Sequence, residues 1–238
     1  MKKAIIIGAS SGIGRQLAKL LDAQGYEVGI AARRLDLLTT LQAELQHTSY
    51  LQKMDIANCD AAQQQLHALL DKMRTVDLIV ITAGSGQLNP NLDWVTEFAT
   101  LQTNVLGISA VLNSAYHYFR QRGHGHLVAI SSIGALRGDV GNPAYNASKA
   151  YLSNYLQGLR KKVAQAKLPI IITDIKPGFV DTAMAQGEGL FWVASADKAA
   201  RQIMTAINNK RSHAYITRRW RLIAWVMKLL PDALYHRL

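Results

Sequence analysis

Residues Gly8-Ala9-Ser10-Ser11-Gly12-Ile13-Gly14 form the most informative stretch of this 238-residue chain. The stretch follows an apolar run at 4–7 that is typical of a buried strand, and it precedes leucines at helical spacing. A glycine turn between a strand and a helix leaves backbone N–H groups free at the positive helix end, where phosphates bind well. The spacing is Gly-x-x-x-Gly-x-Gly, and an ordinary tight turn is the alternative interpretation. Because the turn joins the first strand to the first helix, we predict a nucleotide site here.

The alternation of strand and helix that begins at this turn continues along the chain. Segments with leucines at helical spacing separate the apolar runs. This order indicates right-handed βαβ units in one domain, which we assign to residues 1–217. It predicts a Rossmann-like, doubly wound α/β fold: a mainly parallel seven-stranded sheet with helices on both faces. Strands buried on both faces are expected at 4–8, 28–32, 50–54, 78–82, 127–131, 170–175 and 214–217.

The composition excludes several classes of protein. Hydrophobic residues make up 49% of the chain and charged residues 18%, which rules out wholesale disorder. The single cysteine, Cys59, excludes an intrachain disulfide and a cysteine zinc cluster, and we expect no metal site. The first apolar run is too short for a signal peptide, and no apolar stretch is long enough for a spanning helix. We therefore expect a cytoplasmic protein.

The positive charge is concentrated near the C-terminus. The formal net charge is +11, and seven Lys or Arg residues but only one Asp lie between residues 210 and 238. Residues 218–238 form a basic amphipathic tail, and its segment 218–230 contains Trp220 and Trp225. Three interpretations stay open: a lid over the substrate, a subunit interface, or a weak contact with a membrane surface. Since the charge lies in one amphipathic segment, we expect no nucleic-acid partner.

The end of the second predicted strand bears on the choice of cofactor. In dinucleotide folds an acidic residue at this strand end binds the ribose 2′-hydroxyl of NAD. Here the strand ends with Ala32, and Arg33 and Arg34 follow. Guanidinium groups match a 2′-phosphate, so the sequence favours NADP (NADPH) as the cofactor. The alternative is that both arginines only begin a solvated helix.

Three polar residues after the fifth predicted strand form a candidate catalytic set. Ser132 follows the strand, and Tyr145 and Lys149 are spaced so that both lie on one face of a helix. A phenol has a pKa of about 10 and is a poor acid at neutral pH. A cation about 4 Å away contributes about 4 kcal/mol in an effective dielectric of about 20. We therefore expect Lys149 to lower the pKa of Tyr145 towards neutrality.

With these motifs in order, the sequence resembles the short-chain dehydrogenase/reductase family in its compact single-domain, Tyr-x-x-x-Lys branch. The resemblance runs from about residue 3 to about residue 217. Thr82 departs from the family's Asn-Ala-Gly motif, where it replaces the asparagine. The resemblance identifies four catalytic residues, Asn104, Ser132, Tyr145 and Lys149. It identifies cofactor contacts at Gly8, Ser10, Ser11, Gly12, Ile13, Gly14, Asp55, Ile56, Ala83, Gly84, Tyr145, Lys149, Pro177, Gly178, Val180 and Thr182.

The resemblance also implies a reaction. Tyr145 would protonate an alkoxide formed by hydride transfer, while Ser132 orients the carbonyl and Lys149 binds the nicotinamide ribose. Asn104 would hold a water that relays protons. We thus predict an NADP(H)-dependent oxidoreductase that reduces a ketone or aldehyde, or reversibly oxidises an alcohol, on an apolar substrate. An NAD-linked alcohol dehydrogenase and a nucleotide-binding regulatory or interaction protein are the alternatives. Family members form homo-dimers or homo-tetramers through long helices, which correspond to about 92–120 and 143–166.

Two further features carry predictions. His124 and His126 resemble a pair of metal ligands, but no carboxylate or cysteine is close in sequence, so we predict a surface turn. Residues 187–195 show no clear periodicity and contain Leu190, Phe191 and Trp192. This pattern predicts a loop insertion and a candidate lid, whose apolar side chains either line the substrate pocket or cover the core.

Overall fold

The computed structural model describes residues 1–182 and 191–235. The strands are β1 Lys3–Ile7, β2 Glu27–Ala32, β3 Ser49–Lys53, β4 Leu78–Ile81, β5 Gly125–Ile130, β6 Ile170–Pro177, β7 Val180–Asp181, β8 Ala194–Ser195 and β9 His213–Ile216. The α-helices are α1 Gly12–Ala23, α2 Leu35–Ala43, α3 Cys59–Met73, α4 Trp94–Leu101, α5 Ile108–Arg122, α6 Pro143–Gln165, α7 Ala196–Asn208, α8 Trp220–Leu229 and α9 Asp232–Tyr235. A π-helical segment, η1 Gln102–Gly107, and a 3₁₀ turn, η2 Ile133–Ala135, complete the described elements.

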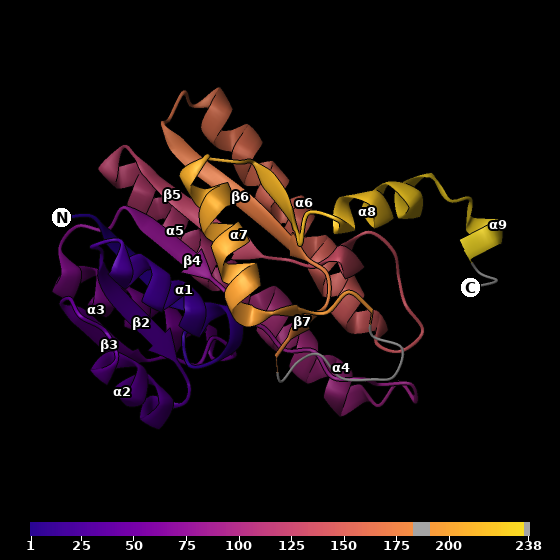
Figure 1. The fold of residues 1–238 in the computed structure, drawn as a ribbon, viewed down its shortest axis with the longest axis horizontal. Coiled ribbons are helices and arrows are strands. Elements are labelled where there is room, and N and C mark those ends of the chain that lie inside the picture. The colour runs from indigo at the N-terminus through magenta and orange to yellow at the C-terminus, as the bar shows by residue number, and fades with distance from the viewer. Residues whose placement is uncertain (183–190, 236–238) are drawn as a thin grey trace.

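Seven of the strands form one parallel sheet in the order β3-β2-β1-β4-β5-β6-β9 (Figure 1). The predicted seven-stranded, doubly wound architecture is therefore confirmed, and every pair of neighbours in this sheet is parallel. The separate β7–β8 pair was not predicted, because two residues per strand are too few to show a pattern. Part of the predicted lid, residues 183–190, lies outside the described residues.

Two apolar cores cover the two faces of the sheet. Alternate residues of β1 point to opposite sides: Ile5 belongs to the core with α3, α5 and α6, and Ile6 to the core with α1, α2 and α7. Burial on both faces is why the central strands β1 and β4 are continuous apolar runs. The expectation of full burial is wrong for β3 and β9, which lie at the two edges of the sheet and are only partly buried. The sheet between its helix layers thus forms a rigid base for the loops at its edges.

The candidate functional residues gather at one edge of this sheet. In a parallel sheet the carboxyl ends of the strands meet at the same edge, and ligands bind where the strand order reverses, here between β1 and β4. The glycine turn follows β1, Arg33 follows β2, Thr82 follows β4, Ser132 comes shortly after β5 and Gly178 follows β6. The topology therefore brings together motifs that are far apart in the sequence.

The C-terminal segment forms helices α8 and α9, which extend beyond the sheet in Figure 1. Trp220 and Ala224 on α8 are buried in a small third cluster with Ile133. No helix within the described part of the chain is long and apolar enough to cross a bilayer.

The prediction of a surface turn at His124 and His126 is wrong for the second histidine. His124 is exposed, but His126 is the second residue of β5 and is buried. Its Nε2 lies 2.8 Å from the Thr173 hydroxyl of the neighbouring strand. Burial, with a smaller contribution from Lys210, lowers the pKa of His126 to about 4. Two glycines beside the histidines suggested a turn, whereas strand β5 already begins at Gly125.

This buried histidine predicts acid sensitivity. The unfolded chain binds a proton at His126 near pH 6.5, but the folded chain does so only near pH 4. Because the folded state keeps this imidazole neutral, the free energy of unfolding is unaffected by titration of His126 above pH 6.5. It falls by about 3 kcal/mol as the pH drops to 4. In urea unfolding at several pH values, we expect His126→Gln to flatten this acid limb. His124→Gln is the control, and an equally steep limb in both variants would exclude His126 as the source.

Candidate active site

The glycine turn after β1 packs so closely that Gly8 and Gly14 have no room for a side chain. Gly8 has a φ of +101° and Gly12 a φ of +54°, a region that favours glycine. A Cβ on Gly8 would lie 2.5 Å from the Ala83 nitrogen, and one on Gly14 would lie 2.2 Å from the Gly8 oxygen. The Thr82 hydroxyl donates to the Gly8 carbonyl at 3.1 Å. Thr82, where the family motif has asparagine, therefore fastens the turn to the end of β4.

The first turn of α1 presents backbone N–H groups at the carboxyl edge of the sheet. Ser11 precedes the helix but does not cap it with its side chain, and the first N–H groups of a helix have no intrahelical acceptor. Ile13 packs on the core and so anchors the start of the helix. A Cβ on Gly12 would lie 3.0 Å from the Thr182 Cγ2, so the loop after β6 approaches the turn. A close backbone and unpaired N–H groups fit the pyrophosphate of a dinucleotide.

Arg34 reaches from the end of β2 across this turn. Its Nη2 donates to the Ser10 hydroxyl at 3.0 Å and to the Ser11 hydroxyl at 2.7 Å. Arg33 is exposed beside it, and the preceding residue, Ala32, provides no carboxylate. The two serines that occupy the glycine turn therefore hold one guanidinium at the turn.

The predicted adenine contacts follow β3. The Asp55 carboxylate is exposed and accepts a hydrogen bond from the Ala57 N–H at 3.1 Å, while Ile56 is buried. A Cβ on Gly107 would lie 2.1 Å from the Ile56 carbonyl oxygen, so this loop packs directly on η1. Asp55 also lines a surface hollow of about 470 Å³ that Cys59 and Gln102 border. Helix α3 begins at Cys59, directly after this loop.

The three predicted catalytic side chains lie together. Tyr145 and Lys149 are one turn apart on α6, which begins at Pro143, a residue suited to the first turn of a helix. The Lys149 Nζ lies 5.6 Å from the centre of the Tyr145 ring and donates to the Ile130 carbonyl at 3.1 Å. The Ser132 hydroxyl accepts from the Gly134 N–H at 3.0 Å and is hydrogen-bonded to Tyr145. Strand β5 and helix α6 therefore bring a phenol, an ammonium and a hydroxyl to one place.

The expected lowering of the Tyr145 pKa is wrong for this structure. Burial raises the pKa of Tyr145, and the hydrogen bond with Ser132 opposes that rise only in part. Burial also lowers the pKa of Lys149 to about 8, against the influence of the Asp174 carboxylate. The simple Coulomb argument omitted the cost of removing both groups from water. Near pH 7 Tyr145 is therefore a protonated phenol and Lys149 is mostly a cation.

Asn104 lies in the π-helical segment η1 and is fully buried. Its Oδ1 accepts from the Ser85 N–H at 2.7 Å, and its Nδ2 donates to the Ser85 carbonyl at 2.6 Å and to the Ser148 hydroxyl at 3.0 Å. Its side chain thus joins the loop after β4 to α6. A Cβ on Gly84 would lie 3.2 Å from the Lys149 Nζ, so Gly84 gives that ammonium its space.

The loop after β6 contains the remaining predicted cofactor contacts. Pro177 ends β6 and Val180 begins β7. The Gly178 N–H donates to the Ile216 carbonyl of β9 at 2.6 Å. A Cβ on Gly178 would lie 2.0 Å from the Trp220 ring, so the loop packs directly on the first residue of α8.

An aromatic cluster, formed by Phe179, Phe191, Trp192 and Trp220, borders this loop. The ring centres of Phe179 and Trp220 are 5.4 Å apart, and those of Phe191 and Trp220 are 5.1 Å apart. Arg219 lies over the Trp192 ring at 5.0 Å. The sequence did not connect Trp220 with the loop after β6, because about forty residues separate them and no periodic pattern links them.

A buried ionic network behind the catalytic set was also missed. The Ser131 hydroxyl donates to Asp174 Oδ1 at 2.5 Å, and the Lys176 ammonium donates to Asp174 Oδ2 at 2.5 Å. Lys176 also donates to the Ser153 hydroxyl on α6, one turn after Lys149. Asp174 and Lys176 are both buried. The network therefore ties β5, next to Ser132, to the helix that carries Lys149.

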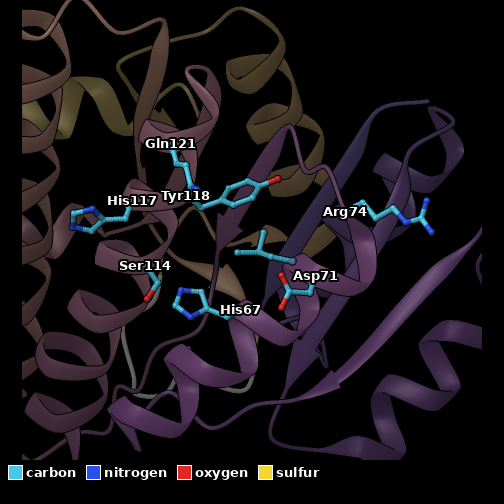
Figure 2. Close-up of a pocket in the computed structure, with 8 residues that line it drawn as sticks. His67, Asp71, Arg74, Ser114, His117, Tyr118 and Gln121 are labelled. Carbon is cyan, nitrogen blue, oxygen red and sulfur yellow. The ribbon is translucent and has the colours of Figure 1, made fainter.

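A polar cavity of about 220 Å³ lies elsewhere, between α3 and α5 (Figure 2). His67 and Asp71 from α3, Arg74 just after α3, and Ser114 and His117 from α5 are among the residues that line it. Arg74 directly follows α3 and comes shortly before β4, so the cavity is near the amino ends of the strands, opposite the catalytic edge. Among the described residues, no three His, Cys, Asp or Glu side chains gather as a metal site.

Comparisons with known proteins agree with this geometry. The sequence model of short chain dehydrogenases matches residues 2–190. An uncharacterized oxidoreductase of Mycobacterium tuberculosis is 31% identical over 247 residues, which cover 99% of this chain and 96% of the relative.

Two solved structures share the fold. A short chain dehydrogenase/reductase from Burkholderia phymatum in complex with NAD has a TM-score of 0.84 and 20% identity, and the match covers 94% of this chain and 92% of that one. An alcohol dehydrogenase from Thermococcus sibiricus complexed with 5-hydroxy-NADP has a TM-score of 0.79 and 21% identity, covering 91% and 96%. At these identities the likeness shows the fold alone, and both nicotinamide cofactors occur among the neighbours.

Proposed function

The chain is an oxidoreductase of the short-chain dehydrogenase/reductase family, and from this premise we propose that it uses NADP(H) to reduce a ketone or an aldehyde. The observation that carries the proposal is the grouping of Ser132, Tyr145 and Lys149 at the strand edge where the glycine turn also lies. Purified protein should oxidise NADPH in the presence of some member of a panel of apolar ketones and aldehydes. Cofactor binding without turnover on any carbonyl or alcohol would instead favour a regulatory or interaction protein.

Each catalytic residue has a separate task in this proposal. When bound, the nicotinamide ring supplies the hydride that reaches the carbonyl carbon. Tyr145 is protonated near pH 7 and donates its phenolic proton to the carbonyl oxygen, which gains negative charge as the hydride arrives. Ser132 holds the same oxygen by a hydrogen bond. The Lys149 cation binds the cofactor ribose beside Gly84, while Asn104 positions α6 through Ser148.

Each cofactor contact that the family resemblance implies is assigned here to one part of a dinucleotide. We assign the pyrophosphate to the glycine turn and α1, and the adenine to the loop with Asp55 and Ile56. We assign the nicotinamide end to Ala83, Gly84 and the loop Pro177, Gly178, Val180 and Thr182. Arg33 and Arg34 are assigned to the 2′-phosphate, since Arg34 already lies on the serines of the turn.

A prediction about cofactor preference tests these arginines. We expect the protein to bind NADPH more tightly than NADH, and Arg34→Ala to weaken NADPH binding by about 10- to 100-fold, because charge-assisted hydrogen bonds contribute about 1.5–3 kcal/mol. Binding of NADH should change little. The measurement is a fluorescence titration with each cofactor, and Arg120→Ala, an exposed arginine at the opposite end of the sheet, is the matched control.

Equal affinity for NADH and NADPH in the parent protein would contradict this assignment. In that case Arg33 and Arg34 do not bind a 2′-phosphate, and the NAD-linked alcohol dehydrogenase becomes the preferred function.

The aromatic cluster supports an apolar substrate. Phe191 and Trp192 are partly exposed beside the loop after β6, and they pack on Trp220 at the start of α8. Such surfaces bind apolar groups through area and edge-to-face contacts. A rank order of carbonyl substrates that follows their hydrophobicity is the expected result. Trp192→Ala should raise KM for apolar substrates more than for polar ones.

The remaining assignments concern the organisation of the chain. We propose that residues 1–217 are the catalytic domain with 218–238 as an appended tail, and that the protein is cytoplasmic and has no nucleic-acid partner. We also propose a homo-dimer or homo-tetramer through α4, α5 and α6, because Trp94, Val95 and Phe98 are exposed apolar residues on α4. Light scattering after size-exclusion chromatography measures the oligomer, and a monomeric mass would reject it.

A further inference from the structure

Helix α8 has two apolar faces on opposite sides. Trp220, Ile223, Ala224 and Met227 have the spacing i, i+3, i+4 and i+7 and belong to the third core cluster or pack against it. A second set has the same spacing two residues later, which places it on the opposite side of the helix. This outer face consists of Leu222, Trp225, Val226 and Leu229, with exposed fractions of 60%, 60%, 59% and 81%.

The body of the protein holds this helix in place. Arg137 donates from Nε to the Met227 carbonyl at 2.9 Å and from Nη2 to the Leu230 carbonyl at 2.5 Å, so it satisfies the C-terminal end of the helix. The same guanidinium pairs with Asp232 at 2.5 Å. Trp220 anchors the other end against Gly178. The outer face is therefore a fixed surface.

Cations border this face. Arg221 and Lys228 are seven residues apart on one flank of the helix, and Arg218 and Arg219 directly precede it. The helix itself has no acidic residue, and Asp232 just beyond it is paired with Arg137. A strip of Leu, Trp and Val beside basic residues is typical of helices that lie in a membrane interface.

A second copy of this chain fits the outer face less well. Four side chains on a ten-residue helix offer a few hundred Å² at most, whereas a stable interface buries about 1,200–2,000 Å². A two-fold contact through α8 would also bring the basic flanks of both copies together, with few carboxylates to offset them. An anionic surface carries charge opposite to that of the basic flank. Binding to it also does not require the large buried area of a stable protein–protein interface.

We propose that the outer face of α8 docks in the surface of an anionic lipid bilayer, with the helix axis parallel to the membrane plane. At about 15 Å the helix is too short to span a bilayer, so it lies in the interface with Trp225 at the level of the headgroups. Trp220, on the inner face of the same helix, contacts the loop after β6. Docking therefore brings the catalytic edge of the sheet close to the lipid.

The test is flotation of the full-length protein with vesicles at low salt. We expect binding to vesicles of phosphatidylglycerol and phosphatidylcholine in equal parts, little binding to phosphatidylcholine alone, and release by high salt. Trp225→Glu combined with Leu229→Glu should weaken binding by about tenfold or more, because it removes buried apolar area and adds repulsion. Arg221→Gln and Lys228→Gln should each weaken it by about fivefold.

Val140→Glu is the matched control, since Val140 is an exposed apolar residue outside α8. A thermal melt and a cofactor titration of each variant show that the fold is intact, and vesicle binding needs no turnover. The proposal is therefore tested separately from the proposed reaction. It is overturned if the protein stays with the unbound fraction, or if the Trp225 and Leu229 double variant floats as well as the parent. It is also overturned if that variant changes the oligomeric mass but not vesicle binding. Such a result would show that a second copy of this chain covers the outer face of α8.

Discussion

Replacing Tyr145 with phenylalanine is expected to slow turnover by about a hundredfold to ten-thousandfold while leaving cofactor affinity unchanged. The variant removes only the hydroxyl that donates the proton, and the ring still packs beneath the Lys149 ammonium, 5.6 Å from its centre. The loss should appear in kcat and in kcat/KM alike, because the proton is transferred in the transition state. Steady-state kinetics with NADPH and the best carbonyl substrate measure it.

Tyr155→Phe is the matched control for this variant. Tyr155 lies on the same helix, is half-buried, and stacks on Tyr151 at 5.8 Å, away from Ser132. It should retain the turnover of the parent protein. Turnover retained in Tyr145→Phe would remove Tyr145 from its role as the acid. Loss of turnover in both variants would indicate that the substitutions disturb the structure of α6.

Replacing Asp174 with alanine is expected to destabilise the protein by about 3–5 kcal/mol. The carboxylate is 2% exposed and holds both the Ser131 hydroxyl and the Lys176 ammonium. Burial lowers the pKa of Lys176, and Asp174 is the first influence that opposes this. Without the carboxylate the ammonium is a buried charge without its counter-ion, and such a charge costs far more than a lost surface pair. Urea unfolding at pH 7 measures the change.

Two further variants show whether this loss of stability comes from the unpaired Lys176 charge or from lost packing. Asp174→Ala combined with Lys176→Met should recover much of the stability, because the unpaired charge is removed together with its partner. Asp197→Ala breaks an exposed ion pair with Arg201 on α7 and should change stability little. A double variant as unstable as Asp174→Ala would show that the cost comes from packing, and not from the uncompensated ammonium.

The strands and the proximity of Tyr145 to Lys149 were the features most readable from the sequence, each for a local reason. Strands buried on both faces must be apolar throughout, so Ile5, Ile6 and Ile7 identify β1 without any knowledge of its neighbours. Tyr145 and Lys149 are four residues apart on one helix, so their proximity follows from helical geometry. His126 was misjudged because adjacent glycines resemble a turn, while the burial of the ring depends on β6.

The amino-acid sequence by itself determined the doubly wound architecture, the glycine turn and the proximity of Tyr145 to Lys149 in the candidate catalytic set, since periodicity and short-range spacing encode all three. Only the tertiary structure decided the protonation of that set, the ion pair of Asp174 and Lys176, and the contact of Trp220 with Gly178. Desolvation depends on every element packed around a group, and contacts between distant segments depend on how the sheet and helices pack. Neither leaves a periodic signal along the chain, so both follow only from the three-dimensional structure.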